Sequence, residues 1–137
     1  RGARYLPMID EMRKKNPDIQ IIMMGGFIGV RPNYCSELIN KLGDYGACKD
    51  EKYVTYWGGD EEDFLMSKDF TKRNYLYVDK ISILCGPGRS LKDCKMRTEE
   101  ELLFYDGDHF SLSGAHYFGK LLADRYREQL NSMGIYY

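Results

Sequence analysis

The residues best suited to chemistry lie near the carboxyl end of the chain, in the stretch "FYDGDHFSLSGA". Asp106 and His109 are three residues apart there, in a turn that contains a glycine. At that spacing the carboxylate can accept the Nδ1 hydrogen of the imidazole, which leaves Nε2 able to take up a proton. The spacing therefore predicts the base and the orienting acid of a hydrolytic triad. We expect the adjacent Asp108 to point away, toward solvent or a basic partner.

The same stretch also fits a well-capped helix that has no catalytic role. Ser111 and Ser113 are good N-cap residues for a helix that begins at this point, and the positive end of its dipole would favour the acids before it. The spacing of the residues leaves both interpretations open. His116, seven residues after His109, is expected to be a partly exposed residue of this helix, and lining the site is its alternative role.

Apolar periodicity predicts the elements that would position these residues. Side chains at three- and four-residue spacing indicate a helix over residues 3–15 and a long final helix over 115–130. The run "DIQIIMM" predicts a strand covered on both faces, and residues 75–79 predict a second strand followed by a helical turn at 81–85. A helix followed by a buried strand is the repeat unit of an α/β sheet.

The intervening residues 27–74 show no sustained period. Short helices at residues 36–42 and 60–70 are the only elements predicted there. The aromatic residues Tyr53, Tyr56 and Trp57 are close enough in sequence to stack on a sugar, although packing on the protein's own core is the commoner use of such residues. No linker divides the chain, so residues 1–137 are expected to form a single domain.

Composition excludes several classes of function. The chain has 20 basic and 21 acidic residues, and this balance argues against a nucleic-acid surface. None of the four cysteines (Cys35, Cys48, Cys85 and Cys94) belongs to a Cys-x-x-Cys pair, so we expect no zinc site of the usual spacing. The sequence leads us to expect no other metal and no cofactor. A disulfide between Cys85 and Cys94 and four unpaired thiols are equally compatible with the count alone.

The stretch from Tyr75 to Ala115 resembles the C-terminal part of the SGNH (GDSL-like) hydrolase domains that are fused to membrane O-acyltransferases. In that family a strand ending in Val-Asp leads to a cysteine pair and then to Asp-x-x-His-Leu-Ser-x-x-Gly-Ala. The chain has "VD", two cysteines and "DGDHFSLSGA", with Phe110 in place of the usual leucine. The family acylates cell-surface glycans.

The resemblance implies a role for each matching residue. Asp106 matches the triad acid, His109 matches the general base, and Cys85 and Cys94 match a pair that is oxidised outside the cytoplasm. The implied fold is a flavodoxin-like three-layer α/β sandwich with a parallel sheet and its active site at the carboxyl ends of the strands. The implied partners are an acyl donor, a glycan acceptor and a fused membrane acyltransferase domain, and the implied location is extracytoplasmic.

The family's nucleophile is missing from these residues. It is a serine in a Gly-Asp-Ser block, but the three Gly-Asp pairs here are followed by tyrosine, glutamate and histidine. We therefore expect Arg1 to lie well inside the domain and the isolated chain to be inactive, although the parent would be a serine-dependent acyltransferase or esterase. The alternatives are a non-catalytic extracellular glycan-binding or structural domain and a free-standing secreted esterase.

Overall fold

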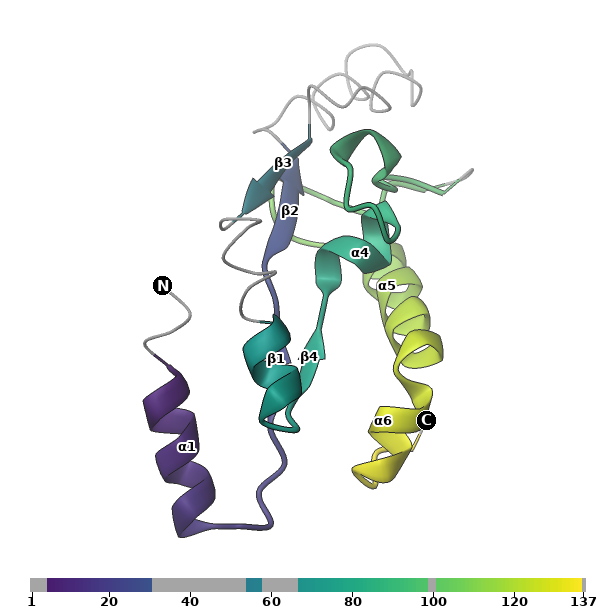
Figure 1. Ribbon diagram of the computed structural model, residues 1–137. Helices are drawn as coiled ribbons and strands as arrows, with labels where there is room; N and C mark the ends of the chain where they lie inside the picture. The colour runs from purple at the N-terminus through teal and green to yellow at the C-terminus, as the bar shows by residue number, and fades with distance from the viewer. Residues whose placement is uncertain (1–4, 31–53, 58–66, 99–100, 137) are drawn as a thin grey trace.

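A computed structural model describes residues 5–30, 54–57, 67–98 and 101–136 (Figure 1). Its elements, in chain order, are α1 (Leu6–Lys15), β1 (Ile22–Met24), β2 (Phe27–Val30), β3 (Val54–Trp57), a helical segment over 67–72, β4 (Leu76–Val78), α4 (Lys80–Cys85), the 3₁₀ helix η4 (Leu91–Asp93), α5 (Leu112–Arg125) and α6 (Arg127–Ser132). The predicted helix at 36–42, the start of the one at 60–70 and the aromatic side chains of residues 53–57 lie outside the described residues.

Two small sheets form the centre of the described fold. Strands β1 and β4 pair in parallel, with Ile22 opposite Leu76 and Met24 opposite Val78. Strands β2 and β3 pair in antiparallel register, and Figure 1 shows β2 continuing from the end of β1 with β3 beside it. The chain is thus a mixed α/β structure with a parallel pair, and the described parallel sheet has two strands.

Helices pack against both faces of the parallel pair. Successive side chains of a strand point to opposite faces, so Tyr77 and Val78 of β4 enter different hydrophobic clusters. Tyr77 packs with the α1 side chains and Phe70, whereas Val78 packs with side chains of α4 and α5. Figure 1 accordingly shows α1 and α5 on opposite sides of the pair. The predicted succession of a helix and a sheet strand is therefore present as α1 followed by β1.

The expectation that the first strand is covered on both faces is wrong. Ile22 and Met24 are 38% and 45% exposed, whereas Met23 between them packs against the α1 cluster. In the described residues β1 is hydrogen-bonded to a strand on one side only. A continuous apolar run does not distinguish a fully covered strand from one with a bare face, which explains the error.

The final helix is also different from the prediction, because it is broken. Helix α5 ends before Tyr126, whose backbone angles (φ −109°, ψ 18°) leave the helical region, and α6 starts at the next residue. The Tyr126 hydroxyl accepts a hydrogen bond from the backbone amide of Asp79 at 3.0 Å. Asp79 is the N-cap of α4, so the break attaches the last helices to the end of β4.

Candidate catalytic dyad

The candidate residues lie in a tight loop that is anchored by aromatic side chains. Phe104 and Phe110 form an antiparallel bridge, and the amide of Tyr105 donates to the carbonyl of His109 at 3.0 Å. The Phe110 ring lies 5.0 Å from Phe27 and 4.9 Å from Phe104, measured between ring centroids. Because Phe27 opens β2 just beyond the end of β1, the loop lies near the carboxyl end of that strand.

Asp106 organises this loop. Its Oδ1 accepts hydrogen bonds from the backbone amides of Asp108 at 3.0 Å and His109 at 2.8 Å, which is the way aspartate commonly stabilises turns. The same carboxylate lies against the imidazole, with His109 Nδ1 2.9 Å from Oδ2 and 3.0 Å from Oδ1. The structure therefore brings together the two residues that the sequence spacing selected.

Asp108 does not point away from His109, and that prediction is wrong. Its Oδ1 lies 3.1 Å from His109 Nδ1, so two carboxylates converge on one ring nitrogen. The physical reason is the turn itself. Because Asp106 Oδ1 holds two consecutive backbone amides, the chain curls and the acidic side chains flank the same ring.

The hydrogen bonds of the loop shift the pKa values of three of its side chains. The backbone amide of Asp108, the amide of His109 and the imidazole hold the pKa of Asp106 well below its usual range. The hydrogen bond that the imidazole donates to Asp106 raises the pKa of His109, and the negative charges of Asp106 and Asp108 act in the same direction. Hydrogen bonding to Asp106 also raises the pKa of Tyr105. The loop thus favours a charged carboxylate and a more basic imidazole.

The imidazole is accessible from solvent. The His109 side chain is 65% exposed, compared with 31% for Asp106. The Tyr105 ring lies 6.0 Å from the imidazole, measured between ring centroids. With Nδ1 directed at the carboxylates, the opposite nitrogen Nε2 is the one left to exchange protons with a substrate or nucleophile.

The two serines after His109 serve the helix rather than the imidazole. Ser111 is the N-cap of α5, and its Oγ accepts from the Gly114 amide at 3.0 Å. Ser113 Oγ lies 3.0 Å from Ser111 Oγ. No described serine hydroxyl is bonded to His109. The capping interpretation of Ser111 is confirmed, and it coexists with the dyad. His116 is exposed on α5, as predicted.

Gly114 determines how closely α5 approaches the loop. A Cβ at this position would lie 1.8 Å from the carbonyl oxygen of Leu103, so only glycine fits without movement of the backbone. That same carbonyl accepts a hydrogen bond from the Ser111 amide at 2.9 Å. The first turn of the helix therefore rests directly on the segment that leads into the dyad.

A disulfide joins Cys85 to Cys94, as the resemblance implied. Cys85 is the last residue of α4, and the bond closes the turn that contains η4. The chain then pairs back toward the site, since the Leu103 amide donates to the carbonyl of Met96 at 2.9 Å. The disulfide, the hydrogen-bonded segments around Met96 and Leu103, and the dyad loop therefore follow one another along the chain.

Asp106, Asp108 and His109 are also the group of described residues with the spacing of metal ligands, since their donor atoms lie within 4.8 Å of one another. The hydrogen bonds and ion pairs within the loop already account for this convergence.

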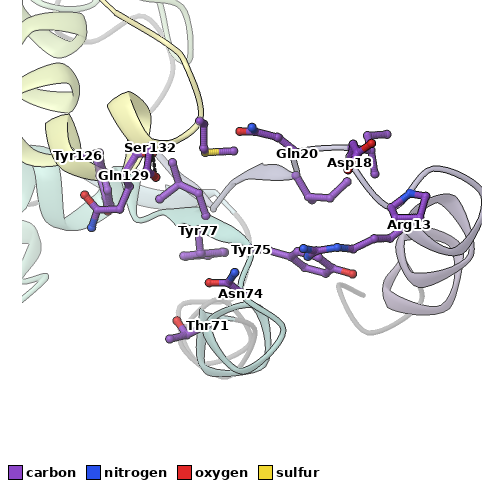
Figure 2. Close-up of a pocket in the computed structure, with 15 residues that line it drawn as sticks. Arg13, Asp18, Gln20, Thr71, Asn74, Tyr75, Tyr77, Tyr126, Gln129 and Ser132 are labelled. Carbon is purple, nitrogen blue, oxygen red and sulfur yellow. Dashed lines mark hydrogen bonds between the residues drawn. The ribbon is translucent and has the colours of Figure 1, made fainter.

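A pocket of about 590 Å³ lies at the other end of the parallel strands (Figure 2). It is lined by the end of α1, the segment before β1, the start of β4 and α6. The Arg13 guanidinium lies over the Tyr75 ring, 5.1 Å from its centroid, and the amides of Gln20, Asn74 and Gln129 also line the space. Its lining contains no histidine. Sequence reasoning missed this pocket because its residues come from four separate segments.

Comparison with known proteins identifies no relative of this chain. No protein-family model matches it, and neither a curated protein nor a solved structure gives a match. In the part of the chain that the structure describes, no helix is both long enough and apolar enough to cross a membrane.

Proposed function

We propose that this chain is the C-terminal portion of an SGNH-type O-acyltransferase or esterase domain that transfers or removes acyl groups on cell-surface glycans. One observation carries the proposal: His109 Nδ1 lies 2.9 Å from Asp106 Oδ2 while the ring is exposed. This is the arrangement of the acid and base of a serine hydrolase triad. Asp106 is the proposed orienting acid and His109 the proposed general base.

The proposed mechanism needs a serine nucleophile, and the sequence has no Gly-Asp-Ser block, so we propose that this serine comes from outside residues 1–137. Nε2 of His109 takes the proton as the serine oxygen bonds to the acyl carbon, and then returns it to the departing oxygen. The acyl group remains on the serine until a glycan hydroxyl or water attacks the acyl carbon; His109 accepts the proton of the attacking oxygen and gives it to the serine oxygen as the bond between that oxygen and the acyl carbon breaks. Hydrogen-bond donors to the oxyanion, each contributing about 3 kcal/mol, must also come from elsewhere.

The remaining features are consistent with this setting. Helices on both faces of a parallel pair agree with an incomplete flavodoxin-like sandwich. The disulfide supports an extracytoplasmic site, because such bonds persist in oxidising compartments. The proposed partners are an acyl donor, a glycan acceptor and a fused membrane acyltransferase domain.

Labelling with a fluorophosphonate, which modifies activated serines, tests the proposal on the protein that contains this chain. We expect one labelled serine, located by mass spectrometry outside residues 1–137, and we expect His109→Gln to reduce labelling by about 10⁴-fold or more. His116→Gln is the matched control, since that exposed histidine lies outside the loop and should leave labelling intact. A labelling rate that His109→Gln leaves unchanged would contradict the assignment of His109 as the general base.

The isolated 137-residue chain gives a second test. It should show no turnover of p-nitrophenyl acetate that depends on His109, because an imidazole without its serine and oxyanion donors lacks most of the rate enhancement. Turnover that His109→Ala abolishes would place a working nucleophile within these residues and contradict the proposal.

A non-catalytic glycan-binding domain is the second candidate, and the pocket of Figure 2 favours it. Uncharged amides beside tyrosine rings are typical sugar contacts, and Gln20, Asn74 and Gln129 provide the amides. Absence of fluorophosphonate labelling, together with glycan binding that Asn74→Ala and Gln129→Ala weaken, would favour this candidate over the enzyme.

A further inference from the structure

We propose that Asp108 is a second orienting carboxylate for His109, which can hold the Nδ1 hydrogen when Asp106 does not. The part of this inference that concerns catalysis rests on the proposed function. The observation behind it is the convergence of two carboxylates on one atom: Nδ1 lies 2.9 Å from Asp106 Oδ2 and 3.1 Å from Asp108 Oδ1. The 2.9 Å distance is typical of a charge-assisted hydrogen bond. The 3.1 Å distance is within the ordinary range of an N–H···O hydrogen bond.

The two carboxylates are not equivalent in what else they hold. Asp106 Oδ1 is shared between the imidazole and the backbone amides of residues 108 and 109. In the described part of the chain, the Asp108 carboxylate has no hydrogen bond or ion pair other than that with His109. Asp106 therefore builds the turn and orients the ring, whereas Asp108 acts on the ring alone.

The charged groups around the imidazole indicate that the effects of the two carboxylates on His109 add together. Among the residues that the structure describes, the titratable groups that face the ring are Asp106, Asp108 and Tyr105, all from the same loop, and the neighbouring rings of Phe104 and Phe110 are apolar. The charge of Asp108 adds to that of Asp106 in raising the pKa of His109. A neutral imidazole has a single Nδ1 hydrogen, so either carboxylate alone can fix the tautomer.

Nuclear magnetic resonance of the 137-residue chain tests the inference without reference to activity. The pKa and the ring-nitrogen shifts of His109 would be measured in the wild type, Asp106→Asn, Asp108→Asn and the double variant. Asparagine is the matched substitution because its side-chain oxygen still accepts the two backbone amides of the turn. We expect each single variant to lower the pKa of His109, and the Nδ1–H tautomer to be lost only in the double variant.

The outcome that overturns the inference is specific. If Asp108→Asn changes neither the pKa nor the tautomer of His109, in the wild-type background and in Asp106→Asn, then Asp108 has no orienting role. The backbone amide shifts of His109 and Gly114 report whether the turn and the α5 cap persist in each variant, so an effect that arises from loss of the fold is recognised as such.

Fluorophosphonate labelling of the protein containing this chain supplies the catalytic readout. Each single asparagine variant should label about tenfold more slowly, because one carboxylate remains, and the double variant should approach the roughly 10⁴-fold loss of a triad with the wrong tautomer. A double variant no slower than Asp106→Asn would contradict the inference. Labelling that His109→Gln leaves unchanged would instead defeat the proposed function, while the magnetic resonance result on Asp108 would stand separately.

Discussion

At the scale of single residues, the most informative feature is that the Asp106 carboxylate has two roles. Asp106 closes the turn through two backbone amides and orients the imidazole at the same time. The pairing of Asp106 with His109 could be predicted from their spacing, because a three-residue turn has few ways to place the two side chains. The position of Asp108 could not, since it depends on how tightly the turn curls.

The dyad should make stability depend on pH in a defined direction. The pKa of His109 is raised in the folded state, so its contribution is fully present below about pH 6.5 and is lost as the pH rises through the folded value. The pKa of Asp106 is lowered, so its contribution is present above about pH 4 and is lost as the pH falls through the folded value.

We therefore expect the difference in unfolding free energy between the wild type and His109→Gln to be largest between about pH 4 and pH 6.5. Urea unfolding at a series of pH values measures it. Because the His109 side chain is 65% exposed, the difference should shrink in about 1 M salt, where charges are screened within roughly 3 Å. A difference that stays constant from pH 4 to pH 9 would contradict the assigned ion pair.

At the scale of elements, the start of α5 determines where the dyad lies. The Ser111 cap and the contact of Gly114 with Leu103 place the helix on the segment before the loop. The cap could be predicted, because serine followed by an apolar helical pattern is a known start signal. The break at Tyr126 could not, since the contact made there, a hydrogen bond from the Asp79 amide to the Tyr126 hydroxyl, joins residues 47 positions apart in sequence.

Two glycines of α5 provide a matched pair of substitutions. Gly114→Ala should destabilise the chain and displace the loop, because its Cβ would meet the Leu103 backbone at 1.8 Å. Gly119→Ala should stabilise it by about 0.5–1 kcal/mol, since that position is open and alanine is the better helix former. Thermal or urea unfolding of both variants measures the effect. Equal behaviour of the two would contradict the close approach of α5 to Leu103.

At the scale of the whole molecule, the described fold consists of helices on both faces of a parallel pair of strands. The disulfide lies in the hydrophobic cluster that contains the side chains of α4 and α5. The α/β class could be predicted from a helical period followed by an apolar strand. The antiparallel pair β2–β3 could not, because Phe27 to Trp57 lacks the alternation that marks a half-buried strand. The bare face of β1 was missed for the related reason that its run is uniformly apolar.

Removal of the disulfide should weaken this whole arrangement. Replacing both Cys85 and Cys94 by serine should lower the unfolding free energy by about 2–3 kcal/mol, on the loop-entropy account for a short loop. Amide exchange of Leu103, which bonds to Met96 just after the disulfide, should accelerate in the same variant. Unfolding measurements in urea supply the first value. Unchanged stability and exchange would show that the bond constrains only its own turn.

The double duty of Asp106 has a consequence for any survey of substitutions along this chain. A library scored by cellular abundance would rank position 106 among the architectural sites, since most replacements lose the acceptor that the turn requires. A library scored by turnover would rank it among the chemical sites. Asparagine is the replacement that separates the two rankings, because it retains the acceptor oxygen and discards the charge.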